Sequence, residues 1–268
     1  MSYKADSAAY STAMAADGTV TFSGTTSGRV HLLQRDVILP SSSTGIEGTP
    51  QDVDVSDNGN WIGIGTSYPR VYMRSADGST TRYYDTQGTV QTVDWVSDAQ
   101  YMAAGSDDDR VYLFKNSSSA PIWSYSTEGN VLDVMMSDDK TYVAAGSLDD
   151  KIYILKRSGG SRLWSYDTGD AVIGVAISYN GSFISAISGD TLYYFGISSS
   201  TPLWSKDMDY TVNSLAMSSN GSYIIVGGDD NMLRVYNSTG SLLWSYTADS
   251  DVTLVSASGS GSVIMIAT

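Results

Sequence analysis

Apolar residues in this chain gather in short runs that are separated by turn-forming residues. Runs such as VAIS, SYIIV, KIYIL and LLWSY are rich in β-branched and aromatic residues, which favour strands. Hairpin signals stand between the runs, among them Asn180-Gly181 and Asn220-Gly221. No helical period of 3.6 residues competes. The chain is therefore predicted to be all-β, with sheets that pack on neighbours through both faces because the runs do not alternate strictly.

One phrase recurs along the chain. Trp123, Trp164, Trp204 and Trp244 each stand in a version of LWSY, at spacings of 41, 40 and 40 residues. A period near 40 is typical of propeller blades, and each unit reads as four short strands. The second strand of a unit carries small residues and the fourth carries Trp and Tyr, which suits sheets that converge at one end and diverge at the other. This pattern predicts a β-propeller.

The register predicts seven blades in one domain, 1–268. Six whole units span about residues 9–48, 49–88, 89–129, 130–170, 171–210 and 211–250. The opening phrase MSYKADSA matches WSYTADSD at 244–251, so residues 1–8 are predicted to be a closing strand that shares the last blade with residues 251–268. The equivalent of residues 229–243 is missing from that blade. Either residues 1–8 occupy the place of the third strand, or an edge stays open for a strand from a partner.

Two known families share these motifs. NGSYIIVGGDDNMLRVY and DAQYMAAGSDDDRVYLF resemble the second and third strands of WD repeats, while STGSLLWSYTADS and SGGSRLWSYDTGD resemble the Trp docking motif of quinoprotein (PQQ-like) propellers. Archaeal and bacterial surface propellers combine both. The chain lacks the Gly-His and Trp-Asp dipeptides of true WD repeats and the vicinal cysteines of many quinoprotein enzymes. The resemblance therefore implies a fold and not an activity.

Composition removes several classes of function. The chain has no cysteine and one histidine, His31, which excludes thiol chemistry and histidine metal clusters. Neither a phosphate-binding loop nor an EF-hand spacing occurs. The net charge of -14 argues against nucleic acid as a partner. No run of about 20 apolar residues could span a membrane, and the N-terminal residues do not read as a secretory signal. We expect no cofactor and no catalytic residues.

Aspartates recur in the turns between second and third strands and in the links between blades. A propeller brings these two kinds of segment to one face, which should be strongly acidic. Two interpretations stay open: a binding face for a basic partner or for hard cations such as Ca²⁺, and tight turns built by the aspartate side chains themselves. The candidate residues are Asp107, Asp108, Asp109, Asp149, Asp150, Asp170, Asp190, Asp209, Asp229, Asp230 and Asp251.

Four sequons fall on the opposite face, at Asn116, Asn180, Asn220 and Asn237. They indicate either glycosylation or good turn residues. The Trp and Tyr residues could stack on sugars, although their fixed register favours packing between blades.

The sequence as a whole predicts a non-catalytic propeller for protein recognition or self-assembly, on a cell surface or a virus particle. The alternatives are a carbohydrate-binding lectin and an enzyme of quinoprotein type.

Overall fold

The computed structural model describes residues 9–15, 20–25, 27, 29–34 and 46–268, and these residues contain strands and turns but no helix. They divide into two compact units, unit 1 from Met1 to Val131 and unit 2 from Leu132 to Thr268. The closing strand predicted at residues 1–8 lies outside the described residues, and so does the side chain of His31, whose backbone belongs to a strand.

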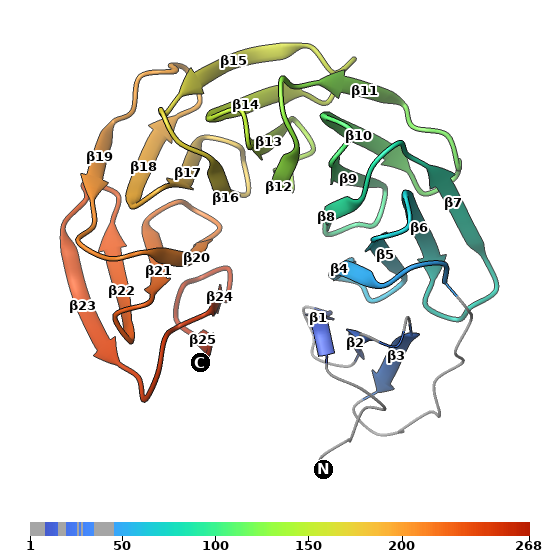
Figure 1. The fold of residues 1–268 in the computed structure, drawn as a ribbon, viewed down its shortest axis with the longest axis horizontal. Coiled ribbons are helices and arrows are strands. Elements are labelled where there is room, and N and C mark those ends of the chain that lie inside the picture. Colours follow the sequence, from blue (N-terminus) through green and yellow to red (C-terminus); the bar gives the residue numbers. More distant parts are fainter. Residues whose placement is uncertain (1–8, 16–19, 26, 28, 35–45) are drawn as a thin grey trace. The chain divides into compact units, whose positions relative to one another are not determined.

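Unit 1 contains three antiparallel sheets in which consecutive strands are neighbours (Figure 1). Sheet 1 holds β1 (Ala9–Met14), β2 (Val20–Thr25) and β3 (Arg29–Gln34). Sheet 2 holds β4 (Pro50–Val55), β5 (Trp61–Thr66), β6 (Arg70–Ser75) and β7 (Thr81–Asp85). Sheet 3 holds β8 (Val90–Trp95), β9 (Tyr101–Ser106), β10 (Arg110–Lys115) and β11 (Trp123–Ser126).

Unit 2 repeats this meander. Sheet 4 holds β12 (Val131–Met136), β13 (Tyr142–Ser147), β14 (Lys151–Lys156) and β15 (Arg162–Asp167). Sheet 5 holds β16 (Val172–Ile177), β17 (Phe183–Ser188), β18 (Thr191–Gly196) and β19 (Trp204–Asp207). Sheet 6 holds β20 (Val212–Met217), β21 (Tyr223–Gly228), β22 (Met232–Asn237) and β23 (Leu242–Thr247), and sheet 7 holds β24 (Leu254–Ala257) and β25 (Ile264–Ala267).

Within each unit, the sheets stack through their first strands. In unit 1, β4 lies against β1 and β8; in unit 2, β20 lies against β16 and β24. Second strands approach the next sheet closely, as the small residues predicted. A Cβ on Gly146 would lie 2.7 Å from Cγ1 of Val172, and one on Gly227 would lie 2.4 Å from Cγ1 of Val252. Only glycine fits at these two positions.

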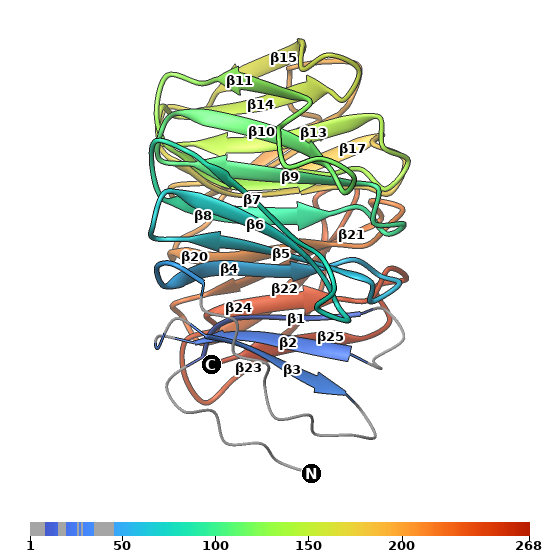
Figure 2. The ribbon, with the colours of Figure 1, turned by 90° about the vertical axis from the view of Figure 1, so that its right-hand side faces the viewer.

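The strands of sheets 2 and 3 cross unit 1 from side to side, and their turns gather at two opposite edges (Figure 2). One edge carries the turns between second and third strands together with the links between sheets. Backbone hydrogen bonds join the two kinds of segment: the N–H of Thr127 donates to the carbonyl of Asp109, and in unit 2 the N–H of Met208 donates to the carbonyl of Asp190. We call this edge the acidic edge of each unit.

Candidate functional site: the acidic edge

The acidic edge of unit 1 contains aspartates that build turns. The carboxylate of Asp107 accepts hydrogen bonds from Gln91 Nε2 (2.9 Å) and Asn130 Nδ2 (3.1 Å). Asp108 accepts from the backbone N–H of Gln87 (2.9 Å) and from the hydroxyl of Tyr112 (2.7 Å). Burial, followed by the bond to Asp108, raises the pKa of Tyr112 far above its ordinary value. These two carboxylates therefore tie the β9–β10 turn to the links on either side of sheet 3.

The next turn residues in the repeat also make local bonds. Asp149 accepts from the hydroxyl of Tyr153 (2.6 Å) and the N–H of Lys151 (3.1 Å), which repeats the Asp108–Tyr112 bond. Asp109 and Asp150 have φ of 62° and 67°, a left-handed conformation that aspartate tolerates better than most residues. Their place in the turn is thus set by backbone geometry as well as by side-chain bonds.

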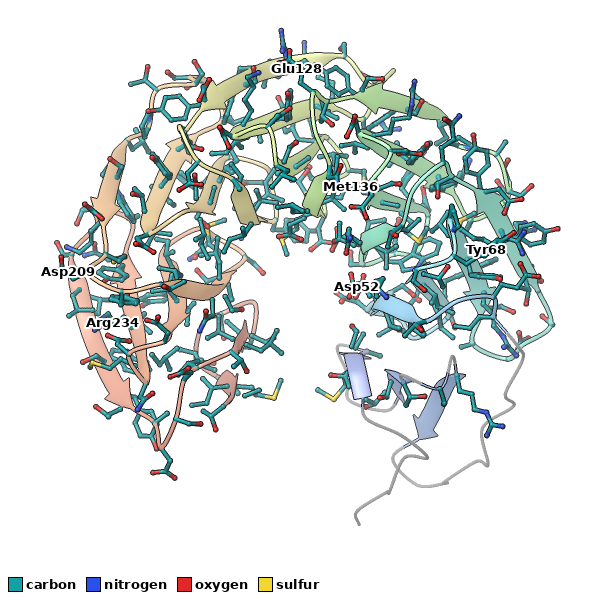
Figure 3. The ribbon with its side chains drawn as sticks, in the orientation of Figure 1. Asp52, Tyr68, Glu128, Met136, Asp209 and Arg234 are labelled. Atoms are coloured by element: carbon teal, nitrogen blue, oxygen red, sulfur yellow. The ribbon has the colours of Figure 1, made fainter. Side chains whose placement is uncertain are left out.

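Sheet 6 contains an aspartate–arginine pair at the acidic edge of unit 2. Both guanidinium ends of Arg234 bond to the Asp230 carboxylate, and the guanidinium stacks on the Tyr210 ring at 4.1 Å. The bond to Asp230 raises the pKa of Arg234. The neighbouring Asp229 accepts the N–H of Thr211 at 3.0 Å. Figure 3 shows Asp209, in the link before β20, near the sheet that carries Arg234.

Three of the predicted aspartates are different. Asp190, Asp209 and Asp251 are exposed, and within the described part of the chain their carboxylates make no hydrogen bond or ion pair. Asp170 is also exposed, and its carboxylate accepts only the N–H of the next residue, Ala171 (2.8 Å). The acidic edge of unit 2 therefore carries carboxylates that the fold does not use. The described residues hold no group of three or more acidic or histidine side chains placed to bind a metal ion.

Sequence reasoning missed a second set of polar residues, on the first strands of the sheets. In sheets 1, 2, 4 and 6, the side chain at the third residue of the first strand accepts the N–H of a valine 41 or 42 residues later, in the next sheet. These bonds are Ser11–Val53 (3.1 Å), Asp52–Val93 (2.9 Å), Asp133–Val175 (2.8 Å) and Ser214–Val255 (3.0 Å). A first strand lies at the edge of its sheet, so its outward N–H groups need acceptors from elsewhere. The signal was a polar residue recurring at the period of the tryptophans.

One of these junctions carries two carboxyl groups. On β4, Asp52 accepts the N–H of Val93, and Asp54 accepts the N–H of Trp95 at 2.6 Å. Both side chains retain some solvent exposure, yet protein atoms surround them closely. Desolvation raises the pKa of Asp52, and desolvation with the neighbouring charges of Asp52 and Asp57 raises the pKa of Asp54 to about 7. Figure 3 marks Asp52 on the first strand of its sheet.

The sequons lie in turns and at strand ends. The amide nitrogen of Asn116 donates to the carbonyl of Ala99, while Asn180, Asn220 and Asn237 accept hydrogen bonds from their own turns. Each asparagine therefore has a turn-building role, and their glycosylation stays a prediction.

A family model described as "Outer membrane protein assembly factor BamB", of PQQ-like repeats, matches residues 86–200 and, in an overlapping second match, residues 148–265. The chain belongs to this BamB-like family. No curated protein matches the chain. A solved structure titled "Crystal Structure of Mitotic Checkpoint Complex" contains a chain that is 17% identical, with a TM-score of 0.81 over 96% of this chain and 83% of that one. That likeness shows the fold: this BamB-like chain is a β-propeller, and its blade number of seven stays a prediction.

The tryptophans of this BamB-like chain lie on the fourth strands β11, β15, β19 and β23, at Trp123, Trp164, Trp204 and Trp244. The indole N–H of Trp164 donates to the carbonyl of Ile197 (2.8 Å), and that of Trp204 donates to the carbonyl of Ser238 (2.9 Å). Each acceptor lies in the turn after the third strand of the following sheet. Trp244 is 47% exposed. No helix in the described part of the chain is long and apolar enough to cross a membrane.

Proposed function

We propose that this BamB-like propeller is a non-catalytic scaffold that recognises a basic protein partner through the acidic edge of unit 2. The observation that carries the proposal is the set of unused carboxylates at Asp190, Asp209 and Asp251. A carboxylate that builds no turn contributes nothing to the fold at that position. Its charge is instead available to attract a partner.

The setting of these carboxylates supports recognition. They project from turns and links whose backbones are joined to each other, as in the Met208–Asp190 bond. Loops held on a firm scaffold are common binding segments. Asp167, Asp207 and Asp249 are also exposed at this edge, while Arg234 is already paired with Asp230. The exposed aspartates give the acidic edge of unit 2 a negative electrostatic potential, which favours binding of Lys- and Arg-rich surfaces and speeds their association.

The comparisons support a protein as the partner class. The matching family model is named for an assembly factor, and the similar solved chain belongs to a complex. A position on a cell or virus-particle surface stays a prediction.

The test is binding of the full chain to immobilised synthetic peptides rich in Lys, in Glu or in Ser, at two salt concentrations. We expect binding to the Lys-rich peptide only, weakened at high salt because screening reduces interactions between exposed charges. The triple variant Asp190→Asn, Asp209→Asn, Asp251→Asn should lose at least tenfold in affinity. The matched control neutralises Asp57, Asp98 and Asp138, which lie in turns between first and second strands, and should keep its affinity once its thermal stability is shown to be unchanged.

Equal losses in both triple variants would contradict a partner at the acidic edge, because net charge alone would then explain binding. A glycan array that binds the chain while the peptides do not would favour the lectin alternative. An absorbance band of a bound quinone in the native protein would favour the quinoprotein alternative.

A further inference from the structure

The fourth strand of sheet 6 exposes large apolar side chains. On β23, Leu242 is 51% exposed, Trp244 47% and Tyr246 56%. The equivalent residues of β15, Trp164 and Tyr166, are half-buried. Sheets 5 and 7 explain the difference, because sheet 5 covers β15 with a third strand, whereas sheet 7 has two strands in the described part of the chain.

The outer edge of β25 is available for strand pairing. The carbonyl of Ala267 accepts the N–H of Thr253, so Ala267 directs its backbone groups toward the start of the β24 segment. Alternate residues of a strand direct their backbone groups to opposite sides. Ile264 and Ile266 therefore direct their N–H and C=O groups away from β24. Within the described residues no strand pairs with that edge, and such an edge is a template for another strand.

Sheet 5 shows what a third strand does at the equivalent place. In β18, Phe195 lies opposite Ile184, and Tyr193 lies opposite Ala186. The Phe195 ring lies 5.5 Å from the Trp164 ring and 5.4 Å from the Tyr166 ring, and Tyr193 lies 5.9 Å from Tyr166. Two rings at alternate positions thus cover the preceding fourth strand.

The third strand is also followed by a hydrogen-bond acceptor for the Trp164 indole N–H. Its acceptor is the carbonyl of Ile197, which follows Phe195 by two residues. Unit 1 repeats the ring contacts, since Tyr84 of β7 lies 5.7 Å from Tyr112 and 5.8 Å from Phe114 of β10. The arrangement therefore belongs to the repeat and not to one pair of sheets.

The strand register of sheet 7 matches that of sheet 5, so the residues that face a third strand in sheet 5 can be matched to residues of sheet 7. The pairing of β24 with β25 places Val255 opposite Ile266, as Val175 lies opposite Ala186. Ile264 and Ile266 then correspond to Ile184 and Ala186. Trp244 and Tyr246 correspond to Trp164 and Tyr166 in the same way.

We propose that the β25 edge and the exposed face of β23 form a docking site for an extended segment of a partner protein. The segment pairs antiparallel to β25 and carries two aromatic side chains two residues apart, opposite Ile266 and Ile264. Its first ring packs on Tyr246 and its second between Tyr246 and Trp244, and a carbonyl two residues further on accepts the Trp244 indole N–H. This is strand addition, in which the main chain gives affinity and alternate side chains give specificity.

The chemistry of the surface selects an apolar, uncharged segment. The strand LLWSYT of β23 and the strand IMIA of β25 contain no charged residue. Inner side chains of an added strand would be desolvated against these residues, and a lysine or arginine there would lose its hydration without a partner. The docking site rests on the proposed role in protein recognition. It uses other residues than the acidic edge, so either site can fail its test alone.

The test uses a fluorescein-labelled synthetic peptide of residues 189–200, GDTLYYFGISSS, which contains the β18 strand and its acceptor carbonyl. Fluorescence anisotropy measures its binding to the full chain in trans. We expect saturable binding that is reduced at least tenfold when both Tyr193 and Phe195 of the peptide are replaced by serine. Trp244→Ser and Ile266→Pro in the full chain should each cause a similar loss.

Each variant has a purpose. Ile266→Pro removes an outward N–H from an edge strand, where proline is tolerated, and circular dichroism must show an unchanged fold. Trp244→Ser keeps the test open if the proline variant does not fold. Tyr179→Ala, which removes another exposed ring (53% exposed) in the β16–β17 turn, is the matched control and should bind like the wild type.

Binding that survives both the serine peptide and Ile266→Pro would overturn the docking site. An absence of binding to the wild type would also overturn it. If deletion of residues 1–8 then created binding, the occupant would be the chain's own N-terminal segment. If the wild type failed to bind and instead formed a dimer that Ile266→Pro dissolved, the occupant would be a second copy.

Discussion

Strands β15 and β23 occupy the same place in their sheets and have closely similar sequences, RLWSYD and LLWSYT, yet their surroundings differ. The tryptophan of β15 has rings and a carbonyl acceptor from sheet 5, while the tryptophan of β23 is half exposed. Burial of these aromatic side chains is therefore a property of the following sheet and not of the strand that carries them. The same residue stabilises the fold at one site and is available for binding at the other.

The largest expected difference in the free energy of unfolding comes from Phe195, whose ring covers β15. Phe195 is fully buried, so Phe195→Ala should lower the free energy of unfolding by about 3–5 kcal/mol through lost burial and the cavity left behind. Leu254→Ala, at a 55% exposed position of sheet 7, should change it by less than about 0.5 kcal/mol. Urea unfolding of both variants measures the difference, and equal losses would show that sheet 7 is packed as tightly as sheet 5.

A second comparison concerns the contact between β4 and β8, where the carboxyl groups of Asp52 and Asp54 accept backbone N–H groups of β8. The pKa of Asp54 is about 7 in the folded chain against an ordinary value of 3.8, so the folded state binds this proton more tightly than the unfolded state. Stability should fall as pH rises from about 4 to about 7, at about 1.4 kcal/mol for each pH unit at most.

Asp54→Asn removes this titration. Urea midpoints at several pH values from 4.5 to 8 should fall less steeply for the variant than for the wild type. Parallel pH profiles would show that Asp54 titrates as an ordinary surface carboxyl.

The bond between Asp133 and Val175 joins sheets 4 and 5. Asp133→Ala leaves the N–H of Val175 without this acceptor, which should cost about 1–3 kcal/mol. Ser214→Ala removes the corresponding bond to Val255, next to the sparsely covered sheet 7, and should cost less. Amide hydrogen exchange at Val175 and Val255 measures each effect locally, and unchanged exchange at Val175 would contradict the role of Asp133.

The smallest expected effect isolates the indole hydrogen bond. Trp164→Phe keeps a ring but loses the donor to Ile197, which should lower the free energy of unfolding by about 1 kcal/mol. Trp244→Phe should leave it nearly unchanged in the absence of a partner. A larger loss at Trp244 than at Trp164, measured by urea unfolding, would mean that the exposed face is already covered in solution.

The sequence predicted the strands well because each one combines a run of β-branched and aromatic residues with a hairpin signal, as in VAIS followed by Asn180-Gly181. Position-by-position periodicity also predicted that Trp164 and Trp204 would recur on fourth strands. It could not distinguish Asp149, which holds a tyrosine hydroxyl, from Asp190, which holds nothing in the described residues. The two residues differ in register: Asp149 lies two residues before β14, within reach of the Tyr153 hydroxyl, whereas Asp190 directly precedes β18.

The bonds of the first strands were missed for a related reason. Asp133 stands in the mostly apolar strand VLDVMM, and Asp52 stands in PQDVDV. Neither residue lies next to a cationic residue or a hairpin signal that would mark it as an acceptor. Their partners, Val93 and Val175, contribute a backbone N–H, which no side-chain pattern reveals. Only the stacking of sheets through their first strands makes the period of 41 or 42 residues meaningful.

The hydrogen bonds between first strands also affect how a chain of this kind can gain repeats during evolution. Sheet 2 contributes an acceptor, Asp52, toward the sheet after it and a valine N–H, that of Val53, toward the sheet before it. A gene duplication that copied this repeat in frame would therefore copy both halves of the connection together. The inserted repeat would inherit a matched connection on each side, and no compensating substitution would be needed in its neighbours.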